Sequence, residues 1–183
     1  MKNDKVFSKF IYTLKKTSQY EKEINGKKYK KYMTDSQLEV VNFDRFKGWY
    51  LSNLHKTGYP TGYDLKSVDA LYIPNADVLI FIEFKSGNVN ESDIRKKVSD
   101  SVIIYLDYKD EKLSNFRKNS KFILVVSEDS REHLASIFDN KGGANKKQNT
   151  KSDYRNFKGF YFSDVKIISP STLEKELNIN LPL

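Results

Sequence analysis

The sequence contains no cysteine and only two histidines, His55 and His133. Disulfides and thiolate zinc sites are therefore excluded. With no Gly-x-Ser-x-Gly motif and no glycine-rich phosphate loop, triad hydrolases and nucleotide-binding loops are poorly supported. No apolar run approaches the roughly 20 residues of a membrane span, and no signal-peptide apolar core follows the first residues. We therefore expect no membrane partner and a cytoplasmic location.

Arginine is scarce although the chain is basic. The 32 basic residues outnumber the 24 acidic ones, which gives a formal net charge of +8. Such an excess suggests a polyanionic partner, and nucleic acid is the commonest. Proteins that read base edges rely on arginine, and only five of the basic residues are arginine. A lysine-rich composition is also common in proteins from AT-rich genomes, so composition alone leaves both explanations open.

The length of 183 residues suits one domain. We expect a single domain over residues 1–183, with an N-terminal helix and hairpin extension at 1–34. Residues 141–155 are polar and lack apolar periodicity, which predicts a mobile basic loop. Its lysines Lys146 and Lys147 are candidates for contact with nucleic acid.

The N-terminal extension contains two local signals. Apolar residues spaced by three and four predict a short helix over Lys5–Lys16. Asn25-Gly26 lies between short runs and predicts a hairpin. Folding there pairs acids with lysines across the strands, Glu23 with Lys28 and Glu21 with Lys30. This lysine- and tyrosine-rich hairpin could contact a nucleic-acid backbone, or it could be a solvated surface element.

The stretch Ser67–Gly87 predicts two strands joined by a turn near Asn75. The first strand carries Asp69, and the second carries Glu83 and Lys85. Residues two apart in a strand share a face, so Glu83 and Lys85 point the same way. The second strand is otherwise apolar on both sides, as in a strand covered on both faces. We expect Asp69 to lie opposite Glu83, so that two acids and a lysine converge.

These residue types suit phosphodiester hydrolysis. Carboxylate oxygens of Asp69 and Glu83 are hard ligands for Mg²⁺ or Mn²⁺, and a divalent ion offsets the repulsion between them. Lys85 could orient or help to deprotonate the attacking water, or stabilise charge on the phosphate. Alternatively, Glu83 and Lys85 form a salt bridge at the rim of the sheet and Asp69 is an incidental strand-end acid.

Two predicted helices flank these strands. The first runs from about Gln37 to His55 and places Glu39 on the same stripe as several rings. Glu39 is either a further site acid or a boundary residue paired with Arg45 or Lys47. The second helix runs from about Glu91 to Asp107. Its first turns carry a basic cluster that opposes the helix dipole and so invites an anionic partner, or is only a solvated face: Arg95, Lys96 and Lys97.

The C-terminal part of the chain contains further predicted strands and helices. Residues 110–120 read as a polar connection, and Lys121–Ser127 as a buried strand. A short helix is expected near residues 130–138. Two short strands and a final short helix follow, at Phe157–Phe162, at Val165–Ile168 and after Ser169.

The order helix, two strands, helix and strand, with Asp69 followed by Glu83-Phe84-Lys85, resembles the PD-(D/E)xK nuclease superfamily. The resemblance covers residues 35–126, about half of the chain. Val68 stands where the family motif has proline, and no Gln-x-x-x-Tyr motif follows in the next helix. The resemblance implies an α/β (α+β) restriction-endonuclease-like core of αβββαβ order, with a central mixed sheet flanked by helices.

The resemblance also implies roles for these residues. Asp69, Glu83 and the main-chain carbonyl of Phe84 would hold the metal, Lys85 would be catalytic, and Glu39 would be a helix acid. Lys97 lies near the position of a polar helper in some members. The expected function is a Mg²⁺- or Mn²⁺-dependent nuclease acting on DNA. The alternative is a non-catalytic binding or inhibitor protein of phage or mobile-element type, and a homodimer or another protein partner stays open.

Overall fold

The computed structural model describes residues 4–58, 64–87, 89–128 and 154–179. These residues form a mixed six-stranded sheet in the order β1-β4-β5-β6-β7-β8. The pairs β1–β4, β4–β5 and β5–β6 are antiparallel, whereas the pairs β6–β7 and β7–β8 are parallel. The strands of this sheet are β1 Ile11–Thr13, β4 Glu39–Asn42, β5 Ala70–Asn75, β6 Val78–Lys85, β7 Ser120–Val126 and β8 Asp164–Ile168.

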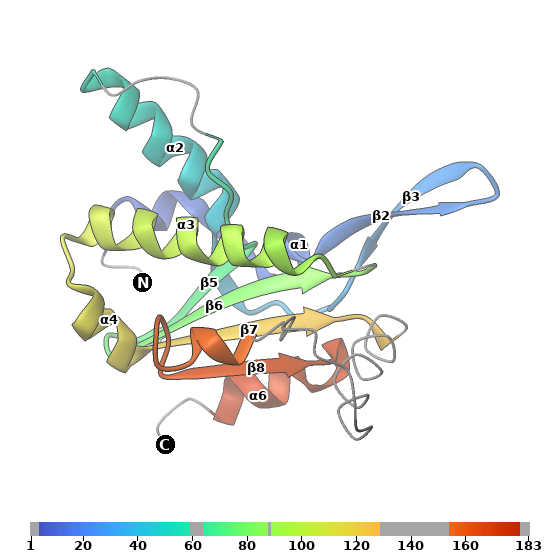
Figure 1. The fold of residues 1–183 in the computed structure, drawn as a ribbon. Coiled ribbons are helices and arrows are strands. Elements are labelled where there is room, and N and C mark those ends of the chain that lie inside the picture. Colours follow the sequence, from blue (N-terminus) through green and yellow to red (C-terminus); the bar gives the residue numbers. More distant parts are fainter. Residues whose placement is uncertain (1–3, 59–63, 88, 129–153, 180–183) are drawn as a thin grey trace, which may run out of the picture.

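Helices cover both faces of the sheet (Figure 1). One face packs against α2 Phe43–Lys56, α3 Glu91–Lys109, α4 Leu113–Asn119 and the 3-10 helix η1 Phe7–Phe10. The other packs against α1 Leu14–Thr17 and α6 Leu173–Ile179. Two further 3-10 helices are η3 Tyr154–Phe157 and η4 Pro170–Thr172. None of the helices in the described ranges has the length and apolar character needed to cross a membrane.

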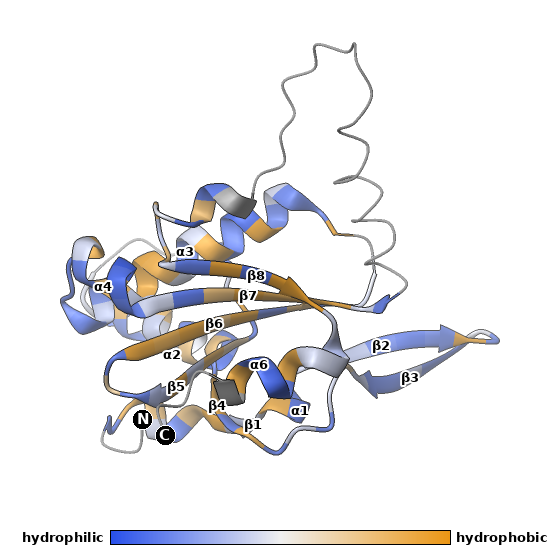
Figure 2. Cartoon of the chain, turned by 90° about the horizontal axis from the view of Figure 1, so that it is seen from below, coloured by the Kyte–Doolittle hydropathy of each residue, from blue (hydrophilic) through white to orange (hydrophobic). Residues whose placement is uncertain are grey.

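The central strands are buried because their side chains are apolar on both sides. Leu79 and Phe81 of β6 point into the core beneath α2 and α3, whereas Ile80 and Ile82 point into the core beneath α6. Figure 2 shows β6 and β7 as largely hydrophobic. The antiparallel β5–β6 pair and the buried strand β7 confirm the predictions for Ser67–Gly87 and Lys121–Ser127, and a mixed α+β sheet flanked by helices is confirmed with them.

A second, two-stranded sheet consists of β2 Gln19–Ile24 and β3 Lys27–Tyr32, and we call it the ribbon. Its turn residues Asn25 and Gly26 both have positive φ angles, 52° and 74°, as hairpin turns of type I′ require. The predicted cross-strand pairs of Glu23 with Lys28 and Glu21 with Lys30 are confirmed. The ribbon projects away from the six-stranded sheet (Figure 1).

Two N-terminal predictions are wrong. Residues 5–16 do not form one helix, because Ile11–Thr13 pairs with β4 as an edge strand. The helix expected from Gln37 begins only at Phe43, and Glu39–Asn42 is strand β4. The Asn42 side chain accepts a hydrogen bond from the Arg45 N–H at 3.0 Å and so caps α2.

Three further expectations are corrected. The expected αβββαβ order is not seen in the described ranges: only β5 and β6 lie between α2 and α3, and β4, which precedes α2, fills the sheet position beside β5. The polar connection 110–120 contains α4, because Phe116 packs into the core. Residues 157–162 form the end of η3 and one isolated bridge instead of a strand. Strand β8 and helix α6 confirm the remaining predictions.

The helix expected near residues 130–138, with Lys146, Lys147 and most of the 141–155 loop, lies outside the described residues.

Candidate active site

Asp69 and Glu83 meet at the end of the β5–β6 pair. Ala70 lies opposite Ile82, and continuing this register places Asp69 opposite Glu83. The Phe84 N–H donates a 2.7 Å hydrogen bond to Asp69 Oδ2, so the Asp69 side chain lies against β6. The main-chain carbonyl of Asp69 accepts a 3.1 Å hydrogen bond from the N–H of Phe43, the first residue of α2. The predicted convergence of the two acids is therefore present in the structure.

Glu83 is a fully buried carboxylate, with 0% of its surface exposed. Its Oε1 accepts a hydrogen bond from Lys97 Nζ at 2.7 Å and lies 3.2 Å from Lys85 Nζ. Its Oε2 has no hydrogen-bond partner among the described residues. A buried polar atom without a partner is costly, so Oε2 marks a position where a cation or a donor would be stabilised.

Two lysines and a third acid complete the centre. Lys97 comes from α3, and its Nζ lies 3.8 Å from Asp69 Oδ1 as well as against Glu83. Lys85 also contacts Asp93 Oδ2 at 3.0 Å, and the other oxygen of Asp93 contacts Lys66 Nζ at 2.5 Å. Lys85 therefore contacts both Glu83 and Asp93. We call Asp69, Glu83, Lys85, Asp93 and Lys97 the acid–lysine centre.

Burial and mutual repulsion set the protonation behaviour of the centre. Burial first, and the charge of Glu83 second, raise the pKa of Asp69 well above its usual value, although Lys97 opposes this shift. Burial also raises the pKa of Glu83 against the effect of Lys97 and Lys85. For Lys97, burial lowers the pKa, but the charges of Asp69 and Glu83 outweigh burial and raise it. Hydrogen bonding from Lys66, and then from Lys85, lowers the pKa of Asp93 to about 2.

Asp44 is an acid near the site that the sequence analysis missed. It lies in the first turn of α2, and it accepts hydrogen bonds from Ser67 Oγ and, at 3.2 Å, from Lys47 Nζ. Its charge raises the pKa values of Asp69 and Lys97. The signal that could have found it is Asn42, a good N-cap residue that starts the helix just before Asp44.

Glu39 is not part of the centre, so its assignment as a helix acid is wrong. It lies on β4 and pairs with Thr13 of β1. The point where this segment contacts the centre is Phe43, whose N–H donates to the Asp69 carbonyl. Glu39 lies four residues before Phe43 in the sequence. At about 3.3 Å per residue, four strand residues span about 13 Å. The error arose because the strand was taken as the first turns of α2.

The oxygen atoms at the centre fit a hard divalent cation in part. Asp69 and Glu83 supply carboxylates, and one oxygen of Glu83 lacks a partner. The N–H and C=O of a strand residue point the same way, so the Phe84 carbonyl lies on the side of Asp69. Within the ranges that the structure describes, however, no group of three or more histidine and acidic residues is arranged to hold a metal. Two carboxylates and one carbonyl are therefore the oxygen ligands available to an ion at the centre.

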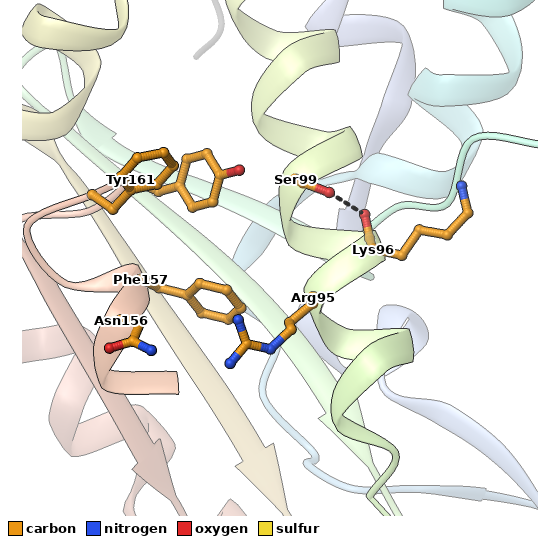
Figure 3. Close-up of a pocket in the computed structure, with 7 residues that line it drawn as sticks. Arg95, Lys96, Ser99, Asn156, Phe157 and Tyr161 are labelled. Carbon is orange, nitrogen blue, oxygen red and sulfur yellow. Dashed lines mark hydrogen bonds between the residues drawn. The ribbon is translucent and has the colours of Figure 1, made fainter. Parts of the chain in front are cut away.

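The predicted basic cluster on α3 divides between two places. Lys97 belongs to the acid–lysine centre, whereas Arg95 and Lys96 line a pocket of about 500 Å³ between α3 and the segment around η3 (Figure 3). Arg95 bonds Glu91 at 2.7 Å, and its guanidinium carbon lies 5.8 Å from the centre of the Phe157 ring. Lys96 Nζ contacts Asp100 at 3.0 Å. The three residues therefore do not form one basic patch.

No family model matches this sequence, and no match was found among the curated proteins or the solved structures. The chemistry open to the centre follows from its atoms. A fully buried acid and a half-buried acid, with two ammonium groups beside them, can bind a cation, position water or a phosphate oxygen, and move a proton.

Proposed function

We propose that this chain is a metal-dependent nuclease of the PD-(D/E)xK type that hydrolyses phosphodiester bonds in DNA. The observation that supports it is the convergence of Asp69, Glu83 and Lys85 at the end of two buried strands, where one carboxylate oxygen of Glu83 has no partner among the described residues. The described sheet is compatible with a restriction-endonuclease-like core, with β4 in place of one strand of the meander.

In this proposal Asp69, Glu83 and the Phe84 carbonyl would hold the ion. A bound Mg²⁺ or Mn²⁺ would stabilise charge on the phosphoryl oxygens and lower the pKa of a coordinated water. Lys85 orients the attacking water or stabilises the phosphate, because Asp93 fixes its ammonium group beside Glu83. Asp44, in the first turn of α2, adds negative charge near Asp69.

Lys97 gives the centre a built-in counter-charge. Its ammonium group lies against Glu83 and 3.8 Å from Asp69, on the same carboxylates that would ligate an ion. Ion binding therefore requires Lys97 to share these oxygens or to turn toward a substrate phosphate. In either position, Lys97 would add positive charge close to the scissile bond.

A second candidate is the non-catalytic binding or inhibitor protein on the same scaffold. Lysines already neutralise the acids, and the described residues offer no three-ligand group for a metal. If the lysines replace the ion permanently, the centre is structural and the chain acts through its charged surfaces alone.

Cleavage assays separate these two functions. The protein is incubated with supercoiled, linear and single-stranded DNA and with RNA, in Mg²⁺, Mn²⁺ or EDTA. The nuclease proposal expects cleavage of DNA that needs the metal and is lost in Glu83→Gln and Lys85→Met. Matched controls change an exposed acid on the β5–β6 turn, Asp77→Asn, and an exposed lysine on α4, Lys118→Met, and both should retain cleavage.

Metal binding is measured independently of activity. Mn²⁺ titrated into the protein in a calorimeter should give a binding isotherm that Glu83→Gln abolishes and Asp77→Asn retains. No cleavage of any substrate, together with no metal binding, would refute the nuclease and leave the binding protein.

A further inference from the structure

The two faces of the ribbon carry different charges. Side chains alternate between faces along each strand, and directly paired residues share a face. The register pairs Tyr20 with Lys31, Lys22 with Tyr29 and Ile24 with Lys27. These six residues, which we call the basic face, include three lysines and no acid.

The opposite face balances its charges. It contains both glutamates of the ribbon, paired with two lysines, and we call it the balanced face: Gln19, Glu21, Glu23, Lys28, Lys30 and Tyr32. Lys28 Nζ lies 3.3 Å from Glu21, and Lys15 of the body lies over the Tyr32 ring, 5.2 Å from its centre. The lysines of the basic face, Lys22, Lys27 and Lys31, form no ion pair with the described residues. All unbalanced positive charge of the ribbon therefore lies on one face.

This segregation is not explained by folding. Every ribbon residue except Tyr20 is exposed, and Tyr29 and Ile24 keep 46% and 42% of their surface in contact with solvent. Exposed ion pairs and charges contribute little to stability, so a charge-balanced arrangement on both faces would serve the fold equally well. An acid-free face of lysines with an exposed ring complements a polyanion whose charges are regularly spaced.

The dimensions of the ribbon suit a DNA duplex. A strand of six residues spans about 20 Å, and residues four apart, such as Lys27 and Lys31, lie about 13 Å apart. The major groove of B-DNA is about 12 Å wide and admits a two-stranded β-ribbon. A ribbon lying along the groove would place Lys22 of β2 and the lysines Lys27 and Lys31 of β3 toward phosphates on opposite sides.

The position of the ribbon agrees with this use. In both views the ribbon extends beyond the same end of the sheet at which β6 ends (Figures 1 and 2). Glu83 and Lys85 lie at that end of β6. A duplex held by the ribbon would therefore run past the acid–lysine centre.

We infer that the basic face of the ribbon binds the sugar–phosphate backbone of double-stranded DNA, along the walls of the major groove. The inference rests on the proposed function, since it assigns a duplex substrate to the same site. Binding through lysine and phosphate is independent of base sequence, in agreement with the scarcity of arginine. The ribbon therefore supplies affinity and orientation, and it adds no sequence preference.

The test compares two variants with the same change in charge. Lys27→Gln/Lys31→Gln alters the basic face, and Lys28→Gln/Lys30→Gln alters the balanced face of the same strand. Affinity for a short labelled duplex is measured by fluorescence anisotropy in EDTA, across a range of salt concentrations. The basic-face variant should bind on the order of tenfold more weakly, with a slope of log K against log salt that is smaller by about 2. The balanced-face variant should keep the slope of the unmodified protein.

Two results would overturn the inference: equal losses in the two variants, or no binding of duplex DNA by the unmodified protein. A duplex RNA of the same sequence serves as a second probe, because its major groove is too deep and narrow for a ribbon. Equal dependence on Lys27 and Lys31 with this RNA would also refute the groove assignment. Since binding is measured without metal, these outcomes are separate from the cleavage assay. If the basic-face variant binds duplex DNA more weakly but the protein cleaves no substrate, only the nuclease proposal is refuted. If the protein cleaves DNA but the basic-face variant binds it as well as the unmodified protein does, only the role of the ribbon is refuted.

Discussion

The acid–lysine centre and the ribbon are built from the same residue types in opposite surroundings. Both combine lysines with acids on neighbouring strands. In the centre, Glu83 is fully buried and Lys97 keeps only 20% of its side-chain surface exposed. In the ribbon, Lys28 and Glu21 keep 71% and 59% of theirs.

This difference decides what each charge does. Removing one partner from a buried ion pair leaves an uncompensated charge in a medium of low polarity. Removing one from an exposed pair leaves a charge in water. The charges of the centre are therefore coupled to folding and to pH, whereas the charges of the ribbon are free to be arranged for a partner.

The largest expected effect is that of removing the cation of the centre. Lys97→Met leaves the Glu83 carboxylate buried with only Lys85 beside it, so we expect a loss of about 3 kcal/mol of unfolding free energy at neutral pH. Lys96→Met, one residue away, should cost about 0–1 kcal/mol, because Lys96 is half exposed and its buried partner Asp100 keeps a hydrogen bond from the Lys66 N–H. Urea denaturation of the two variants measures both values.

The loss in Lys97→Met should also depend on pH. Because the pKa of Glu83 is raised, the carboxyl becomes neutral as the pH falls, and a neutral carboxyl needs no counter-ion. The loss should therefore be largest above neutral pH and should shrink in acid. Equal costs for Lys96→Met and Lys97→Met would show that the centre is as solvated as the surface.

A smaller effect of opposite sign is expected for Asp69→Asn. Burial and Glu83 raise the folded-state pKa of Asp69 above its unfolded value, so ionised Asp69 destabilises the fold. The amide removes this repulsion and should add about 0.5–2 kcal/mol of stability. Under the proposed nuclease function, the same variant should lose metal-dependent cleavage. The gain should be full above the folded-state pKa and should disappear as the pH falls from that value to the unfolded one. A loss of stability at pH 8 in urea denaturation would contradict this assignment.

The smallest effect on stability is expected in the ribbon. Lys27→Gln/Lys31→Gln removes two exposed charges that form no ion pair with the described residues, so its unfolding free energy should change by less than about 0.5 kcal/mol. The same urea experiment measures it. A change as large as that of Lys97→Met would mean that the basic face supports the fold, and the contrast between the two regions would fail.

The acid pair was predictable from the sequence, whereas its surroundings were not. Alternating side chains and the turn near Asn75 were enough to place Asp69 opposite Glu83, because register and facing follow from local geometry. Only the family resemblance pointed to Lys97, as a polar helper; the sequence pattern could not place it against Glu83, because this contact depends on how α3 lies across the sheet.

The error in placing Glu39 has a similar cause. Leu38, Val41 and Phe46 have a spacing that fits a helix, and nothing nearby in the sequence shows that Glu39–Asn42 pairs with Ile11–Thr13. Strand pairing between distant segments is a tertiary effect that overrides local periodicity. For the ribbon, in contrast, the register was predicted correctly from the Asn-Gly turn. The separation of its charges becomes visible only when the residues are sorted by face.

The hydrogen bond from the Phe84 N–H to Asp69 Oδ2 has a practical consequence. It joins the backbone of β6 directly to the Asp69 carboxylate, which is one of the two acids of the centre. The chemical shift of a single backbone amide should respond to protonation of Asp69, to an arriving cation and to a bound phosphate. The Phe84 amide is therefore a built-in spectroscopic reporter that can follow the site in the unmodified protein.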